Sequence, residues 1–113
     1  MALTISQLFT PVQLPNAVEV LFTMPTSPTT TVLKNGRVRL TNTTGGAVAV
    51  TLYADVAATA SSAANECLPA KSVPANDYID VDIPTLKAGD TLRGFASAAT
   101  SITMHEIGGV LYS

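Results

Sequence analysis

The sequence predicts an all-β protein: a single β-sandwich of about eight strands, jelly-roll or immunoglobulin-like, with an N-terminal arm. The chain of 113 residues fits one domain that can bury a core of its own. Apolar and polar side chains alternate in short segments, as in strands with one face in water. Turn residues separate these segments at intervals of roughly ten to fifteen residues, and we find no amphipathic helical pattern.

The first strand is expected over residues 17–25, AVEVLFTMP, between Pro15 and Pro25. The second lies in residues 29–44, TTTVLKNGRVRLTNTT, whose apolar residues alternate with Arg37 and Arg39 facing water. The pair at 35–36, Asn-Gly, is either a tight hairpin turn or a bulge in one long bent strand. We favour the bulge, because TVLK is short for a hairpin arm.

A glycine turn at residues 45–46 leads into a strand with Val48, Val50 and Leu52 on its inner face. The pattern is weakest over residues 56–74, and within them AATASSAA, residues 57–64, predicts a surface loop, although its alanines also permit a helical turn. A strand follows over residues 77–83, and another over 91–98.

The last strand, in residues 101–113, is expected to be bulged or bent at its Gly-Gly pair, 108–109. The first expected strand begins at residue 17. We therefore divide the chain into an N-terminal arm or edge segment, residues 1–16, and a β-sandwich domain, residues 17–113.

Composition excludes several classes of protein. Charged residues make up only 12% of the chain, about half the usual share, which favours a surface partly covered by partners. The net charge of −2 gives no reason to expect nucleic acid binding. No apolar run is long enough to cross a membrane, and the N-terminus lacks the pattern of a signal peptide. The single cysteine permits no internal disulfide and no cysteine-based zinc site, so we expect synthesis in a reducing cytoplasm.

The acidic strand at 77–83 is the first candidate site. Asp80 and Asp82 share one face with Tyr78, because side chains repeat every two residues in a strand. Two carboxylates could bind Ca²⁺, but such a site needs about six to eight oxygens, usually from a loop. We favour the interpretation that these aspartates are solvated and discourage pairing of the strand with other chains. Asp90, in AGDT, is expected to cap backbone N–H groups of a turn.

Reactive groups do not form a catalytic set in the sequence. Glu106 follows His105 directly and therefore points to the opposite face of a strand. Cys67 has no local histidine and is expected to pack as a small apolar residue. Sugar binding would need exposed aromatic side chains, and Tyr53, Tyr78 and Tyr112 are far apart unless a sheet gathers them. We expect no enzyme activity, no metal and no cofactor.

The N-terminal segment carries the strongest signal of an interaction. Two prolines hinder its inclusion as a central strand. It is either an edge strand on its own sandwich or an arm that lies on a neighbouring subunit or another protein. Burial of its apolar side chains would contribute on the order of 10 kcal/mol before entropy costs. The hypothetical partner interface comprises Leu3, Ile5, Leu8, Phe9, Val12 and Leu14.

Several segments together resemble a family of short bacteriophage virion proteins. They are TTTVLKNGRVRLTNTTGGAVAVTLYAD, SVPANDYIDVDI and LKAGDTLRGFASAATSITMHEIGGVLY. The likeness covers residues 17–112, and its motifs are a bent strand ending in TNT, a VPAN turn, an AGDTL turn and a terminal SITMH strand. The family is of the capsid decoration or cement type, and it has no catalytic residues to carry over.

The resemblance implies a non-enzymatic protein on the outside of the capsid, made in the host cytoplasm and retained in the virion. It would bind the major capsid protein and clamp adjoining subunits, with a homotrimer favoured. The alternatives are a tail or fibre-attachment component and a receptor- or glycan-binding module.

Overall fold

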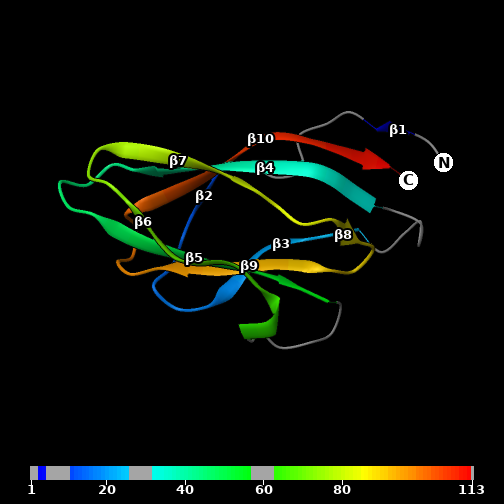
Figure 1. The fold of residues 1–113 in the computed structure, drawn as a ribbon, viewed down its shortest axis with the longest axis horizontal. Coiled ribbons are helices and arrows are strands. Elements are labelled where there is room, and N and C mark those ends of the chain that lie inside the picture. Colours follow the sequence, from blue (N-terminus) through cyan, green and yellow to red (C-terminus); the bar gives the residue numbers. More distant parts are fainter. Residues whose placement is uncertain (1–2, 5–10, 26–31, 57–62, 113) are drawn as a thin grey trace.

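The computed structural model describes residues 3–4, 11–25, 32–56 and 63–112, and within them two antiparallel sheets lie face to face (Figure 1). No α-helix occurs in these ranges. The strands are β1 (Leu3–Thr4), β2 (Val12–Gln13), β3 (Glu19–Thr23), β4 (Val32–Asn42), β5 (Val48–Asp55), β6 (Glu66–Val73), β7 (Asp77–Asp82), β8 (Leu86–Lys87), β9 (Thr91–Ala96) and β10 (Ile102–Tyr112). A 3₁₀ turn, η1 (Ala63–Asn65), directly precedes β6.

Sheet A has the order β1-β10-β4-β7, with β2 also paired to β10 and β8 also paired to β4. Sheet B has the order β3-β9-β5-β6. Residues far apart in the sequence are therefore paired: Leu3 of β1 lies opposite Tyr112 of β10. The expected all-β architecture of two packed sheets is confirmed.

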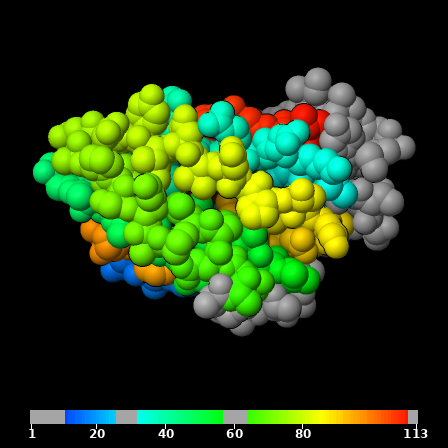
Figure 2. Space-filling model, viewed as in Figure 1, coloured from blue at the N-terminus to red at the C-terminus, as the bar shows by residue number. Residues whose placement is uncertain are grey.

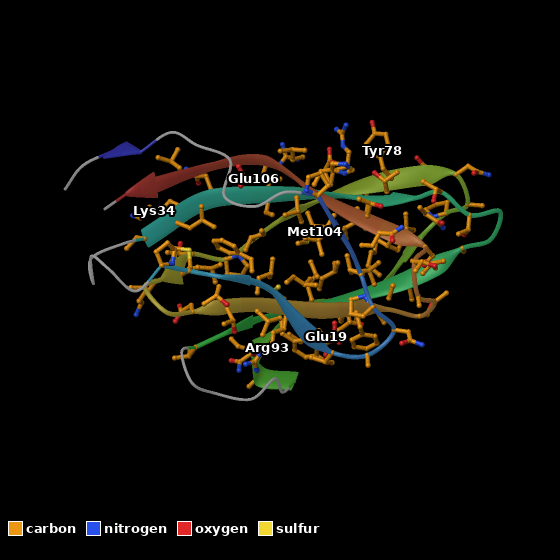
Figure 3. The ribbon with its side chains drawn as sticks, turned by 180° about the vertical axis from the view of Figure 1, so that it is seen from behind. Glu19, Lys34, Tyr78, Arg93, Met104 and Glu106 are labelled. Carbon is orange, nitrogen blue, oxygen red and sulfur yellow. The ribbon has the colours of Figure 1, made fainter. Side chains whose placement is uncertain are left out.

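The core lies between the sheets, because alternate residues of each long strand point inward. Val38 and Leu40 of sheet A and Val50 and Leu52 of sheet B are completely buried, as the sequence pattern predicted. Met104 points into the same space, whereas Tyr78 projects outward from sheet A and Arg93 from the outer side of sheet B (Figure 3).

The predicted bulge at residues 35–36 is confirmed. β4 continues through both residues, and Asn35 takes the left-handed conformation with φ of 57°. Lys34 pairs with Val110 and Arg37 with Gly108, so that two residues of β4 stand opposite one residue of β10. The expected irregularity of the last strand at 108–109 is therefore the partner of this bulge.

A strand that the sequence analysis did not predict follows the expected loop. Residues 66–73 form β6, which pairs with β5 along the edge of sheet B. Alternation fails there because the pairing is irregular: the register shifts twice, and Ala70 has a positive φ of 39°. Residues 57–62 lie outside the described part of the chain.

The described parts of the N-terminal segment form an edge of sheet A. β1 and β2 both pair with β10, on the side away from β4. Leu14 then enters the core with 1% exposure, and its backbone N–H donates to the carbonyl of Ile102 at 2.9 Å.

Candidate functional site

Two arginines of β4 face two aspartates of β7 on the outer side of sheet A. Arg39 lies directly opposite Asp80, and Arg37 opposite Asp82. The guanidinium of Arg39 donates to both carboxylate oxygens of Asp80, at 2.8 and 3.2 Å, which is the bidentate geometry of strong Arg–carboxylate pairs. Arg37 Nε donates to Asp82 Oδ1 at 2.9 Å. We call these four residues the arginine–aspartate ladder.

Hydrogen bonding within the ladder changes the ionisation of its inner pair. The bond from Arg39 lowers the pKa of Asp80, and the same bond raises the pKa of Arg39. The guanidinium carbon of Arg39 also lies 4.2 Å from the centre of the Tyr78 ring, a cation–π contact. The ladder is therefore an ordered, charge-balanced surface.

The sequence correctly predicted that Asp80 and Asp82 face solvent, and it missed their pairing with the arginines. The signal was present, because both arginines and both aspartates recur at a spacing of two on outward faces. Only the strand register, which the sequence does not reveal, brings the two pairs together. No group of three metal-ligating side chains gathers within the described residues.

A hollow of about 370 Å³ lies where β4 bulges beside the end of β7. Asn35, Gly36 and Arg37 line one side, and residues 82–85 line the other. The backbone N–H of Ile83 donates to the carbonyl of Gly36 at 2.7 Å, which joins two of the lining residues. Among the residues that line the hollow there is no histidine and no cysteine.

His105 lies beside the ladder, on the neighbouring strand. It pairs with Arg39 across β10 and β4, whereas Glu106 pairs with the inward-facing Val38. The two side chains therefore belong to opposite faces, as the sequence predicted. The residue directly opposite His105 is Arg39, whose guanidinium already donates a hydrogen bond to Asp80.

Cys67 and Asp90, which the sequence analysis also considered, contribute to packing and to a turn. Burial raises the pKa of the Cys67 thiol, which packs against the core and contacts the carbonyl of Leu52 at 3.6 Å. Asp90 accepts a hydrogen bond from the backbone N–H of Lys87 at 3.0 Å, so its predicted turn-capping role is confirmed. Tyr53 and Tyr78 lie on different sheets, so the fold does not gather them for sugar stacking.

The N-terminal interface hypothesis needs correction at one residue. Leu14 packs within the core of its own chain, because β2 pairs with β10 and carries the next residue between the sheets. Val12 is half-buried in β2, and Leu3 pairs through its backbone in β1. Ile5, Leu8 and Phe9 lie outside the described residues, so the hypothesis stays a prediction for them.

The sequence analysis did not predict the ion pair between Asp55 and Arg93. Asp55, at the end of β5, has a completely buried side chain, and its Oδ2 lies 3.5 Å from Nη1 of Arg93 on β9. Arg93 is 25% exposed. Burial of a carboxylate requires such compensation, because removing a charge from water is costly.

Within the described ranges, none of the elements is a helix of the length and apolarity needed to cross a membrane. A comparison of the chain with protein-family models, with curated proteins and with solved structures found no match.

Proposed function

We propose that this protein is a structural component of a bacteriophage virion, a capsid decoration or cement protein without enzyme activity. It binds the outside of the major capsid lattice, after synthesis in the host cytoplasm, and stabilises the head. Two observations support the proposal: the sequence resemblance over residues 17–112, and the order of the strands in the two sheets.

The strand order supports a jelly roll. The ten strands of the described residues reduce to eight when β1 and β2 are counted as one edge strand and β8 as a continuation of β7, since each pair adds to the same neighbour. The first of the eight then pairs with the last, the second with the seventh, the third with the sixth and the fourth with the fifth. This is a long hairpin rolled up into two sheets, an architecture found in viral capsid and lectin domains.

A rigid sandwich can act mechanically in this role. Packaged DNA pushes neighbouring capsid subunits apart, and a block bound across their boundary must be detached before they separate. Apolar area buried at each contact adds about 25 cal/mol per Å² to that cost. Assembly of the protein as a trimer would hold each copy more firmly, because a second contact forms at a high effective concentration.

A glycan- or receptor-binding module is the second candidate, and one feature favours it. Tyr78 is 50% exposed on the outer face of sheet A, and the guanidinium of Arg39 stacks on one face of its ring. Aromatic rings beside arranged polar groups are suited to sugar stacking.

The deciding experiment mixes the purified protein with heads that lack it and images the particles. We expect added density outside the capsid lattice at many symmetry-related positions. Density at the single tail vertex would favour the tail or fibre component instead. Heads that remain bare, together with binding of the protein to a glycan array that Tyr78→Ala abolishes, would favour the second candidate.

A further inference from the structure

Asn35 and Gly36 form the only Asn-Gly pair in the sequence. The other asparagines, at positions 16, 42, 65 and 76, precede alanine, threonine, glutamate and aspartate. Glycine has no Cβ, so its backbone nitrogen is the least hindered and can approach the side-chain amide of the asparagine before it. The pair is therefore the place in this chain where an asparagine side chain reacts most readily with its own backbone.

A regular strand would suppress such a reaction, because hydrogen bonds to both neighbouring strands hold the backbone. β4 does not hold the Asn-Gly pair in this way. On the β10 side, the register passes from Lys34 directly to Arg37. On the other side, β8 pairs with residues 32–33 and β7 with residues 37–42. Within the described residues, the Asn-Gly pair therefore has no register partner on either side.

The Asn35 side chain is exposed, and no hydrogen bond holds its amide within the described part of the chain. Asn42 shows the contrast, because its buried amide bonds to three backbone groups. The bond from Ile83 engages only the carbonyl of Gly36, which does not take part in the reaction.

The hollow of about 370 Å³ is lined by both residues of the pair and is large enough to admit water. Figure 2 shows β4, in cyan, at the molecular surface beside the yellow segment that follows β7. Water and hydroxide, the reagents that the reaction needs, can therefore reach the pair in the folded protein.

We propose that Asn35 is a site of spontaneous covalent modification, at which the side-chain amide is lost and aspartate or isoaspartate is left. The backbone nitrogen of Gly36 gives its proton to hydroxide and attacks the side-chain carbonyl carbon of Asn35. A C–N bond forms and closes a succinimide ring, while the bond to the amide nitrogen breaks and ammonia leaves. Water then opens the ring at either carbonyl. The net reaction consumes one water and releases one ammonia, and no electrons are transferred.

The modification places a new negative charge beside the arginine–aspartate ladder, because Asn35 and Arg37 line the same hollow. Arg37 then has a second carboxylate besides that of Asp82. Exposed ion pairs contribute little to stability, so the exchange of partners leaves the fold intact. Isoaspartate also lengthens the backbone by one carbon, at a point where β4 already bulges against β10. We expect the modified protein to remain folded and to accumulate with time, whatever its function.

The test incubates the folded, full-length protein at neutral and at mildly alkaline pH. Release of ammonia and enzymatic methylation of isoaspartate follow the reaction, and peptide mapping by mass spectrometry assigns the residue. We expect isoaspartate at position 35. It should form faster at the higher pH, because the attacking nitrogen must first lose its proton.

Asn76 is a matched control within the same molecule. It is exposed and has a φ of 52°, close to the 57° of Asn35, but it precedes Asp77 rather than a glycine. We expect Asn76 to react at least about tenfold more slowly, which corresponds to a barrier higher by about 1.4 kcal/mol.

Two variants separate the site from the rest of the chain. Asn35→Gly removes the amide and keeps a residue that readily adopts a positive φ, so the bulge is retained. The isoaspartate signal should disappear in this variant. Asn76→Gly makes the same change at the control position and should leave the signal as it is in the unchanged protein. Circular dichroism melting checks that both variants are folded.

The same protein unfolded in guanidinium chloride shows that the assay detects the reaction at an Asn-Gly pair. If Asn35 reacts only in the unfolded protein, the fold protects it and the inference is overturned. Aspartate without isoaspartate would indicate direct hydrolysis and would overturn the succinimide route. Equal rates at Asn35 and Asn76 would overturn the role given to Gly36.

Discussion

The side chain of Asn42, in sheet A, donates a hydrogen bond to the backbone carbonyl of Val73, in sheet B, at 3.1 Å. The same amide nitrogen donates to the carbonyl of Gly46 at 2.8 Å, and the amide oxygen accepts from the backbone N–H of Thr44 at 2.9 Å. Asn42 is 1% exposed. One buried amide therefore closes the turn between β4 and β5 and fastens it to the other sheet.

We expect Asn42→Asp to destabilise the protein by about 2–3 kcal/mol, because a carboxylate cannot donate to two carbonyls and would be buried beside them. Asn42→Leu should cost less than Asn42→Asp, since it leaves unsatisfied carbonyls but buries no charge. Urea denaturation measures both. Equal stability of Asn42→Asp and the unchanged protein would show that the amide bonds contribute nothing.

Gly94→Ala should destabilise the sandwich by about 1–3 kcal/mol through overpacking. A methyl group at this position would lie 2.6 Å from both Leu52 Cδ2 and the backbone oxygen of Thr51, and the backbone cannot yield cheaply. Gly46→Ala is the control, since no atom lies within 4 Å of the added carbon. Thermal melting of the two variants should separate them clearly, and a similar loss in both would refute the packing argument.

The Arg39–Asp80 pair predicts a dependence of stability on pH. Its hydrogen bond lowers the pKa of Asp80 in the folded protein, so the carboxylate contributes stability above the unfolded value of about 3.9. This contribution is lost as the pH falls through the lower, folded pKa. Asp80→Asn should therefore be less stable than the unchanged protein at pH 7 and equally stable at pH 2. Chemical denaturation at both pH values measures the difference.

A comparison variant tests whether geometry matters within the ladder. Asp82 makes one contact to Arg37 and its side chain is 85% exposed, so Asp82→Asn should change stability at pH 7 less than Asp80→Asn does. The reverse order would contradict the role given to the bidentate bond.

Leu14→Ala should destabilise the chain by about 2–4 kcal/mol, because it removes a side chain that is 1% exposed. For the same reason, deletion of residues 1–14 should lower the melting temperature, which differs from what a detachable arm would do. Val56→Ala, at an exposed valine, is the control and should have little effect. An unchanged melting temperature after the deletion would show that the segment is dispensable for folding.

The sequence predicted those features of the fold that depend on residues close together in the chain. Alternation placed Val48, Val50 and Leu52 in the core, and the Asn-Gly pair at 35–36 was correctly interpreted as a bulge. The sequence analysis did not predict β6, because this edge strand pairs with β5 in an irregular register and its side chains therefore do not alternate. The contacts of Arg39 with Asp80 and of Asp55 with Arg93 join residues about forty positions apart, and such pairs follow from register rather than from local pattern.

β10 lies between β4 and the strands β1 and β2, so a segment that follows all the other described strands in the sequence forms an interior strand of sheet A. While the ribosome still holds these residues, β4 has only β7 and β8 beside it, and Leu14 cannot reach its hydrogen bond to Ile102. Sheet A therefore cannot form completely before residues 102–112 have been synthesised and are free to pair, as expected when contacts join distant parts of a sequence. A premature stop before β10 would yield a product with an open core and exposed strands.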